Sequence, residues 1–425
     1  MERRQFLGAL AAGATTLGRT DTARAAQAGE PLRIGVIGCG WYGGVVLDAA
    51  YRKGGVEAVA VCDVDSDRLA KFAQKAAAAQ ARPPKTCKDW RELLDAPGLQ
   101  AVVIATPPHW HALPFIEACR RGLDVYCEKP LAYDVREGRA MVDAAKKSGR
   151  VVQIGFQRRH SAAIRQAAQY VADGNAGRIV SVAANIHYPA ELKDPKPVAP
   201  PPSLDWDLWC GPAPKLPYSE QVGHFHWRLE HAYGHGHLVD WGIHWIDSIR
   251  VVLGLGMPKA IQAAGGIYGL RGRITTPDVL TAHLEFDSCP VVWSHRIYGQ
   301  AEVAPETNIG MTFFGDKETV FLDDSKYVVV PRGKDAVRRT VEAKNDAQGE
   351  HVGEWIDAVR SRGPVSCPPE DAFRSTATVQ LAMAALESGG PLEWDAAAEQ
   401  VRGNPRAAAL LKREYRGPWV HPWKG

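Results

Sequence analysis

The fold of this chain is decided by one short stretch, Ile34-Gly35-Val36-Ile37-Gly38-Cys39-Gly40-Trp41-Tyr42-Gly43. An apolar run ends in Gly-x-Gly-x-x-Gly, and the residues that follow predict a helix. A strand, a tight turn and a helix N-terminus in this order bind the pyrophosphate of a dinucleotide. In that arrangement Gly38 closes the turn, Gly40 leaves room for the phosphates, and Gly43 lets the helix pack on the strand. The alternative is a glycine-rich turn that binds nothing.

A second apolar run, Val56–Cys62, ends at Asp63, about 20 residues after the last glycine of the motif. A carboxylate at this position binds the hydroxyls of the adenosine ribose. It would repel a 2′-phosphate, so Asp63 favours NAD over NADP. Arg68 follows closely and leaves NADP possible as a second cofactor.

Short apolar runs alternate with helical patterns from about residue 33 to residue 150. The predicted strands are 34–37, 56–62, 101–105, 123–127 and 151–155. This rhythm is typical of a doubly wound parallel α/β sheet, the Rossmann fold, and we assign it to a domain of residues 31–155. Ligand-binding residues in such sheets gather at the carboxyl ends of the strands, where Thr106-Pro107-Pro108-His109 and Glu128-Lys129-Pro130 stand here.

The pattern changes beyond residue 156. Strand-like runs follow one another closely between residues 260 and 330, and helical patterns return at 352–361 and 371–387. We therefore expect an α+β domain over residues 156–425 with an open, mostly antiparallel sheet. A proline-rich segment, 189–217, predicts no regular structure. It could cover a pocket, stack a sugar ring on Trp206 or Trp209, or brace a neighbouring subunit.

The first 28 residues are not expected to belong to the fold. Arg3-Arg4 precede a short, weakly apolar run over residues 8–17, and small-x-small cleavage patterns follow at 23–25 and 26–28. This order predicts a twin-arginine export signal and a periplasmic mature protein, with a disordered tail as the alternative. The twin-arginine route carries folded proteins, which suits a protein that acquires its cofactor before export.

Composition excludes several classes of protein. The formal net charge is +3, and no basic tract is present, so a nucleic-acid partner is not expected. After residue 30 no apolar run approaches the roughly 18 residues needed to span a bilayer, so no transmembrane segment is expected in the mature protein. The eight cysteines include no Cys-x-x-Cys and predict free thiols near the core, with a single disulfide as the alternative.

Two further patterns are candidates for chemistry. Lys129 stands directly before a proline at a predicted strand end, where its ammonium group would lie beside the nicotinamide. Asp240 and His244 are spaced i, i+4, so on a helix both would point to one face. A neighbouring carboxylate raises the pKa of an imidazole and orients it, and such a pair suits removal of a proton from an alcohol. Taken singly, Lys129 could be a solvated turn residue and the Asp/His spacing an accident.

Together these motifs resemble the glucose–fructose oxidoreductase/inositol dehydrogenase (Gfo/Idh/MocA) family. The matching elements are the glycine motif, Asp63, the Thr-Pro-x-x-x-His run from Thr106 to His111, Glu128-Lys129-Pro130, and Asp240-x-x-x-His244. They occur in the family's order and at compatible spacings. The resemblance covers nearly the whole mature chain, and Glu-Lys-Pro is its most specific element.

The resemblance implies a Rossmann domain followed by a domain whose open sheet often forms an oligomer interface, so we expect a homo-oligomer. It implies Lys129, Asp240 and His244 as catalytic residues. The residues expected to bind the cofactor are Gly38, Gly40, Trp41, Tyr42, Gly43, Asp63, Thr106, Pro107, His111, Glu128 and Lys129. Those expected to bind substrate are Arg159, His237, Asp240 and His244, with Arg158 as a further candidate.

The chain departs from the family pattern in a histidine-rich stretch. His235 and His237 alternate with glycines before Asp240, and His224, His226 and His231 precede them. His-x-His can ligate zinc. Polar contacts in a sugar pocket are the interpretation we favour for the stretch, so no metal site is predicted.

These residues predict an NAD(P)-dependent oxidoreductase that acts on a CH–OH group of a sugar, glycoside or cyclic polyol, with a tightly bound cofactor. The first alternative is a redox-neutral, NAD-dependent glycoside hydrolase or lyase that works through a transient keto-sugar. The second is a non-catalytic sugar-binding relative. In each case the partner is a small carbohydrate.

Overall fold

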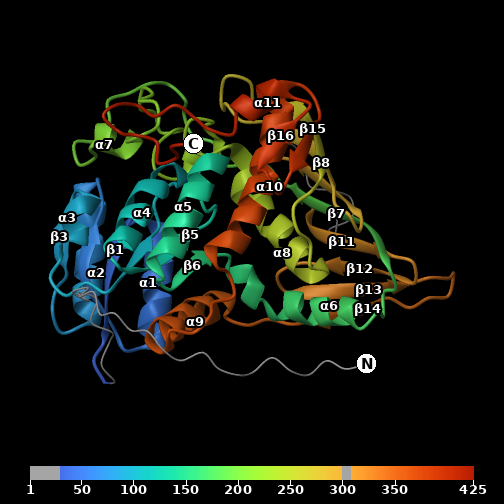
Figure 1. Ribbon diagram of the computed structural model, residues 1–425, viewed down its shortest axis with the longest axis horizontal. Coiled ribbons are helices and arrows are strands. Elements are labelled where there is room, and N and C mark those ends of the chain that lie inside the picture. The colour runs from blue at the N-terminus through green and yellow to red at the C-terminus, as the bar shows by residue number, and fades with distance from the viewer. Residues whose placement is uncertain (1–28, 299–307) are drawn as a thin grey trace, which may run out of the picture.

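The computed structural model describes residues 29–298 and 308–425, and the predicted export signal lies outside this part of the chain. Two β-sheets dominate the molecule. Figure 1 shows the N-terminal sheet and its helices on the left, the larger C-terminal sheet on the right, and helices α8 and α10 between them.

The N-terminal sheet has six parallel strands in the order β3-β2-β1-β4-β5-β6. Its strands are β1 (Leu32–Ile37), β2 (Val56–Cys62), β3 (Lys85–Cys87), β4 (Ala101–Ile104), β5 (Asp124–Glu128) and β6 (Val152–Gly155). Every residue of β4, β5 and β6 is buried, as expected for parallel strands that helices cover on both faces. The strand order reverses between β1 and β4, which places a ligand-binding crevice at their carboxyl ends. The predicted Rossmann fold is confirmed.

Helices from both ends of the chain cover this sheet. They are α1 (Trp41–Lys53), α2 (Ser66–Ala79), α3 (Trp90–Leu94), α4 (Ala112–Arg120), α5 (Val135–Ser148) and α9 (Ala347–Ser361). Helix α9 comes from far along the sequence but packs on α1. Its residues Val352, Trp355 and Ile356 share one buried cluster with Leu32 and Ile34 of β1. The first domain therefore includes a helix that lies beyond the predicted boundary at residue 155 in the sequence.

The C-terminal sheet has ten strands in the order β14-β13-β12-β11-β7-β10-β9-β8-β15-β16. Among the strand pairs that the structure describes, β7 with β10 is parallel and the others are antiparallel, so the mostly antiparallel prediction is confirmed. Its strands are β7 (Ile179–His187), β8 (Ala260–Gly266), β9 (Val279–Glu285), β10 (Pro290–Arg296), β11 (Ile309–Gly315), β12 (Glu318–Leu322), β13 (Lys326–Pro331), β14 (Arg339–Glu342), β15 (Leu392–Asp395) and β16 (Gln400–Arg402).

Helices α6 (Ala162–Ala172), α8 (Ile243–Leu253) and α10 (Pro369–Ser388) pack on strands of this sheet. Alternation along β9 shows that its two faces differ: Leu280, Ala282 and Leu284 are buried, whereas Thr281 and His283 are exposed. This is the pattern of an antiparallel sheet with one covered face and one face in water. The remaining short helix near the C-terminus is α11 (Pro405–Ala409).

The proline-rich segment is not without structure. It contains α7 (Trp206–Cys210), in which Trp206 stacks on Trp209 with ring centroids 4.6 Å apart. The segment also reaches the N-terminal domain, because the carbonyl of Ser203 accepts from the backbone N–H of Ser66 at 2.9 Å. Aromatic stacking thus gives the segment a small core of its own, and backbone hydrogen bonds fasten it to the turn between β2 and α2.

All eight cysteines are free and buried, which confirms the prediction of free thiols. No helix in the described residues is long and apolar enough to cross a bilayer.

Candidate active site

The glycine-rich turn between β1 and α1 has a backbone that only glycine fits. Gly38 has φ +97°, and a Cβ there would lie 2.7 Å from the carbonyl oxygen of Ala105. A Cβ on Gly43 would lie 2.0 Å from the carbonyl oxygen of Gly38, so α1 can approach β1 only with glycine at this position. Helix α1 begins at Trp41 with no side-chain cap and no acidic residue in its first turn. Its first backbone N–H groups therefore suit an anion such as a pyrophosphate.

Asp63 lies at the carboxyl end of β2, beside this turn. Its carboxylate accepts hydrogen bonds from the backbone N–H of Cys39 at 2.7 Å and of Asp65 at 2.9 Å. Burial raises the pKa of Asp63 from its ordinary value. The residue lines the cavity described next, where it lies in position for the ribose of a dinucleotide.

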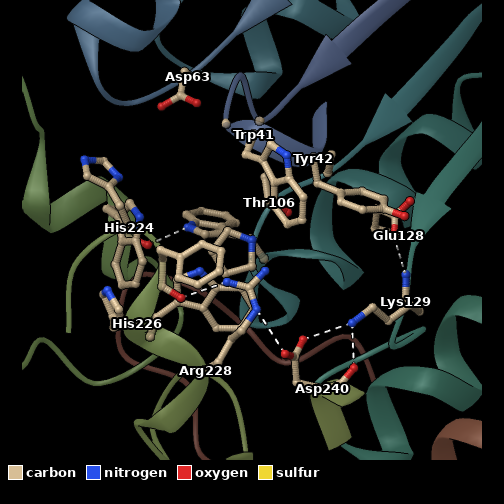
Figure 2. Close-up of a pocket in the computed structure, with 18 of the residues that line it drawn as sticks. Trp41, Tyr42, Asp63, Thr106, Glu128, Lys129, His224, His226, Arg228 and Asp240 are labelled. Carbon is tan, nitrogen blue, oxygen red and sulfur yellow. Dashed lines mark hydrogen bonds and ion pairs between the residues drawn. The ribbon is translucent and has the colours of Figure 1, made fainter. Parts of the chain in front are cut away.

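A cavity of about 660 Å³ lies between the ends of the N-terminal strands and the segments of the second domain that face them. Figure 2 shows its walls, with Asp63, Trp41 and Tyr42 on one side and His224, His226, Arg228 and Asp240 facing them. Of the predicted site residues, those that line the cavity are Gly38, Gly40, Trp41, Tyr42, Asp63, Thr106, Pro107, Glu128, Lys129, His237, Asp240 and His244. The volume is within the usual range for cofactor and substrate sites.

Buried polar atoms around this cavity have no hydrogen-bond partner among the described residues. They are Thr106 Oγ1, Glu128 Oε1, Gln157 Oε1 and His244 Nδ1. Buried polar groups are nearly always hydrogen-bonded, so a ligand that supplies donors and acceptors completes this wall. The site thus fits a dinucleotide in two respects: a glycine turn that admits phosphates, and unpaired polar atoms at the opposite end.

Lys129 and Asp240 join the two domains at the cavity. The ammonium of Lys129 donates to the carboxylate of Asp240 at 2.9 Å and to its backbone carbonyl at 2.6 Å. Arg228 Nε lies 3.0 Å from the other carboxylate oxygen of Asp240 (Figure 2). Burial by itself raises the pKa of Asp240, but the cations of Lys129 and Arg228 outweigh it and hold that pKa well below its usual range. Asp240 is therefore ionised and positions the ammonium group.

The expected pairing of Asp240 with His244 is wrong. Asp240 lies in a turn of π-helix, Leu238–Gly242, and α8 begins only at Ile243. The i, i+4 spacing brings side chains together on an α-helix but not across this wider turn. Burial lowers the pKa of His244 well below its usual value, and the charges of Arg158 and Lys129 add to the shift. His244 is therefore neutral at neutral pH, opposite to the raised pKa that the sequence predicted.

Two other predicted residues lie outside the cavity. Arg159, expected on the substrate, is buried and bonded to Asp247 at 2.6 Å and to Asp371 at 2.6 Å. Its neighbour Arg158 lines the cavity instead, because the short helical turn over Gln157–His160 points the two side chains in different directions. His111, expected on the cofactor, lies behind the wall, with Nδ1 2.8 Å from the Pro130 carbonyl and Nε2 2.9 Å from the Thr106 carbonyl. It braces the two strand-end loops without reaching the cavity.

The last glycine of the motif, Gly43, also stays out of the cavity lining, because its role is the close packing of α1 against β1. His237 lines the cavity and lies 2.8 Å, through Nε2, from the hydroxyl of Tyr188. Of the two tryptophans proposed to stack sugars, Trp209 lines the cavity and Trp206 packs behind it. His237 and Trp209 thus form part of the cavity wall, whereas Gly43 and Trp206 lie behind it.

Sequence reasoning missed Arg228. It lines the cavity, pairs with Asp240, and lies with its guanidinium over the rings of Phe225 and Trp227, 4.6 and 4.5 Å from their centroids. No motif marks this arginine. The only available signal was its place within the histidine- and tryptophan-rich stretch that leads to Asp240.

The proline-rich segment and the residues that follow it, together segment 189–229, also close over the end of the cleft beside Asp63. His224 Nε2 lies 2.9 Å from a carboxylate oxygen of Asp65, and Asp65 itself caps the N-terminus of α2. Nearby, the ring of Phe225 lies 6.1 Å from that of Trp41. The glycine turn, the β2–α2 turn and this segment therefore enclose one end of the cavity.

Comparisons with known proteins agree with this geometry. The model described as "Oxidoreductase family, NAD-binding Rossmann fold" matches residues 32–156, and that described as "Oxidoreductase family, C-terminal alpha/beta domain" matches residues 203–394. The solved structure of a levoglucosan dehydrogenase, in complex with NADH and levoglucosan, has a TM-score of 0.69 at 19% identity and covers 86% of this chain and 99% of that chain. At that identity the likeness shows the fold.

Curated relatives match over shorter stretches. A levoglucosan dehydrogenase of Pseudarthrobacter phenanthrenivorans is 42% identical over 93 residues, which is 22% of this chain and 24% of the relative. An inositol 2-dehydrogenase of Rubrobacter xylanophilus is 33% identical over 150 residues, 35% of this chain and 42% of the relative. A glycosyl hydrolase family 109 protein of Stenotrophomonas maltophilia is 29% identical over 238 residues, 55% of this chain and 51% of the relative.

Each of these curated matches spans less than two thirds of the relative's own length. The two family models, by contrast, together cover most of the chain, in the order in which the two domains occur. With a Rossmann sheet, a glycine turn built for a dinucleotide and a lysine at the end of β5, the chain belongs to the Gfo/Idh/MocA family of NAD-binding oxidoreductases.

Proposed function

We propose that this protein is an NAD-dependent dehydrogenase that oxidises a CH–OH group of a sugar, a glycoside or a cyclic polyol. The observation that carries the proposal is Lys129, whose ammonium is held by Asp240 in the same cavity that the glycine turn and Asp63 line. The relatives named for levoglucosan and inositol support a carbohydrate substrate.

The chemistry follows from the charges of three side chains. NAD⁺, held by the glycine turn and Asp63, would supply the acceptor for a hydride from the alcohol carbon. Lys129 donates a hydrogen bond to the reacting hydroxyl and stabilises negative charge on its oxygen as the proton departs. His244 lines the cavity with a neutral ring, so an imidazole nitrogen is able to take that proton. Asp240 holds the ammonium in place and does not itself accept a proton.

The walls of the cavity suit a hydroxylated ring. Trp41, Phe225 and Trp227 supply aromatic surface, while Arg228 and His237 supply polar groups. Apolar surface with a few placed polar groups is the usual composition of a small-molecule site. Asp63 at the ribose position favours NAD over NADP as the bound form.

The enclosure of the cleft favours a second candidate function. The contacts of segment 189–229 with the β2–α2 turn would slow exchange of the cofactor. A retained cofactor suits a reaction in which oxidation is later reversed, as in redox-neutral glycoside hydrolysis, and a relative named as a family 109 glycosyl hydrolase is consistent with this. The alternative uses the same residues for the oxidation step.

The test is turnover of a carbohydrate panel, including levoglucosan and myo-inositol, followed by nicotinamide absorbance. We expect Lys129→Ala and His244→Ala each to lower the rate by about 10²- to 10⁴-fold, with Lys196→Ala as an exposed lysine control. Turnover at the wild-type rate in both cavity variants would overturn the assignment. Release of an aglycone from a chromogenic glycoside, with no net change in nicotinamide absorbance, would select the redox-neutral reaction.

Export and assembly are further parts of the proposal. The Arg3-Arg4 pattern supports export through the twin-arginine route to the periplasm with the cofactor already bound. The family resemblance, in which the open sheet of the second domain often forms an oligomer interface, supports a homo-oligomer. Mass spectrometry of protein isolated from periplasm, native and then denatured, gives subunit number, cleavage site and bound dinucleotide together. A protein that remains in the cytoplasm would contradict export.

A further inference from the structure

A cluster of possible metal ligands lies beside the cavity but does not line it. His231 and His235 come from the turn that precedes the Asp240 segment, and Glu387 comes from the last turns of α10. One ligand atom from each of the three residues lies within 4.8 Å of the other two. Two imidazoles and one carboxylate form a common donor set for zinc, with a fourth position left for water.

The ring of His235 is oriented as a metal-binding imidazole would be. Its Nε2 lies 3.2 Å from the carbonyl oxygen of Tyr133, so Nε2 carries the proton and donates it. Nδ1 then has a free lone pair, and this atom is buried without a partner in the described structure. A metal-binding histidine usually donates its other ring N–H to a carbonyl or carboxylate in this way, which fixes the ring and its tautomer.

The backbone and the neighbouring ring also hold His235 in place. The residue has φ +63°, a left-handed conformation that is uncommon for histidine, and its ring packs on Tyr133 with centroids 4.3 Å apart. The backbone, the stacked ring of Tyr133 and the hydrogen bond to the Tyr133 carbonyl therefore hold the imidazole in one orientation.

His231 and Glu387 complete the cluster. Nε2 of His231 lies 3.0 Å from a carboxylate oxygen of Glu387. Ligand atoms about 2.0–2.1 Å from a tetrahedral ion lie roughly 3.3 Å from each other, so an ion needs only a small opening of this pair. The side chain of His231 is 43% exposed, which leaves a path for entry from solvent.

Two other clusters of the same kind are already satisfied by the protein. In one, His160 Nδ1 lies 3.1 Å from His351 Nδ1, so the two rings bond to each other. In the other, the guanidinium of Arg413 lies 2.9 Å from Glu137 and supplies the positive charge. The cluster of His231, His235 and Glu387 differs because it keeps an unpartnered nitrogen.

We propose that His231, His235 and Glu387 bind a divalent transition-metal ion, with zinc the best match to the donors. The ion ties the C-terminal end of α10 to the turn that carries His237 and Asp240 into the cavity. Its role is structural: it fixes the position of this turn and takes no part in hydride transfer. Because ion binding is measured without turnover, the proposal stands or falls separately from the proposed function.

The experiment uses full-length protein without a polyhistidine tag, stripped with a chelator and dialysed. Zinc chloride is titrated by calorimetry, and bound metal is counted by elemental mass spectrometry. We expect one ion per chain in the wild type and a loss of affinity of about 100-fold or more in Glu387→Gln and His231→Ala. His235→Asn retains a residue that tolerates the left-handed backbone and is expected to lose binding similarly.

His283→Ala is the matched control, since His283 is exposed on the open face of the C-terminal sheet. Thermal melting of each variant without metal shows whether the fold is intact, and cobalt(II) absorption reports a tetrahedral nitrogen and oxygen site independently. A wild type that binds no zinc, or a Glu387→Gln variant that is folded and binds as the wild type does, would overturn the proposal.

Discussion

Asp240 is surrounded by positive charge, and this decides how the candidate site works. Its carboxylate contacts Lys129 on one oxygen and Arg228 on the other, in a nearly buried position. Two cations outweigh one anion, so the site keeps a net positive charge where a hydroxyl oxygen must become negative. The neutral ring of His244 can then take the proton.

Replacing Asp240 with Asn tests this arrangement. The change leaves two partly buried cations without their counter-ion, and breaking a fully buried ion pair typically costs about 3–5 kcal/mol, which is an upper bound here. We expect kcat/KM to fall by about 10²-fold or more and the melting temperature to drop. Asp287→Asn, at a residue 99% exposed, is the control and should leave both unchanged. Undiminished kcat/KM in Asp240→Asn would show that Lys129 needs no positioning carboxylate.

Glu128 gives a prediction about pH. Burial raises the pKa of Glu128 from 4.5 to about 8, and the charge of Lys129 offsets only part of the shift. Between these two values the folded protein holds a proton that the unfolded chain has lost, so the stability of the wild type falls as the pH rises through this window. Glu128→Gln lacks this titration.

We therefore expect the melting temperature of Glu128→Gln to rise relative to that of the wild type between pH 5 and pH 8. The change corresponds to a few kcal/mol of unfolding free energy. Thermal scans of both proteins at a series of pH values make the comparison, with Glu285→Gln, whose side chain is 43% exposed, as the control. A difference that does not change with pH would show that Glu128 is ionised throughout.

At the scale of elements, α9 shows that sequence order and packing can disagree. This helix follows the strands of the second domain along the chain but packs in the first. Trp355 is fully buried, and its ring lies 5.6 Å from that of Tyr126 in β5. Helix α9 thus covers the sheet whose strand ends bear the glycine turn and Lys129.

Truncating Trp355 to Ala is expected to destabilise the nucleotide-binding domain, because removal of a buried tryptophan leaves a cavity and costs about 3–5 kcal/mol. Tyr268→Ala, at an aromatic residue 59% exposed, should change stability by less than about 1 kcal/mol. Denaturant unfolding followed by far-UV circular dichroism measures both. Equal effects of the two substitutions would mean that α9 does not support the sheet.

The short elements around the site are also informative. The π-helical turn at Leu238–Gly242 moves Asp240 away from His244 and toward Lys129. Single π-turns inside helices are frequent at functional sites. Nothing in the side-chain spacing distinguishes such a turn from an α-helix, and this is why the predicted Asp240–His244 pair was wrong.

At the scale of the whole molecule, the segment 189–229 connects the two domains over the cofactor cleft. Its contacts to the first domain include the carbonyl of Ser203 with the backbone of Ser66, and His224 with Asp65. Burial lowers the pKa of His224, with a further contribution from Arg68, so the contact with Asp65 is mainly a hydrogen bond at neutral pH. We expect release of a dinucleotide to involve opening of this contact, because His224 and Asp65 lie at one end of the cleft.

His224→Ala is expected to release NADH faster, by roughly 2- to 10-fold, because a net hydrogen bond contributes about 0.5–1.5 kcal/mol. Stopped-flow displacement of NADH fluorescence by excess NAD⁺ measures the rate. Lys196→Ala, on the same segment but exposed, is the control. Unchanged release would show that the segment does not limit cofactor exchange.

The sequence alone determined the order of most secondary-structure elements and the glycine turn between β1 and α1. Period and length place the main strands to within about two residues, because burial on both faces demands continuous apolar runs. The glycine turn is also a local feature, because the atoms that leave no room for a Cβ on Gly38 and Gly43 belong to the same β–α–β unit. Lys129 was identified for the same reason, as a charge at a strand end. Strands such as β3, with three residues and little apolar character, left no local signal.

Only the tertiary structure decided which side chains meet. Arg228, Arg159 and His111 were missed or misplaced because each is bonded to a residue of another structural element, at Asp240, Asp247 and Pro130 respectively. The packing of α9 on the first domain and the contacts of segment 189–229 likewise depend on surfaces that distant parts of the chain form together. Local sequence specifies backbone conformation and burial. The pairing of charges instead depends on the free energy of bringing separate groups together out of water, and the tertiary packing of the complete chain determines that free energy.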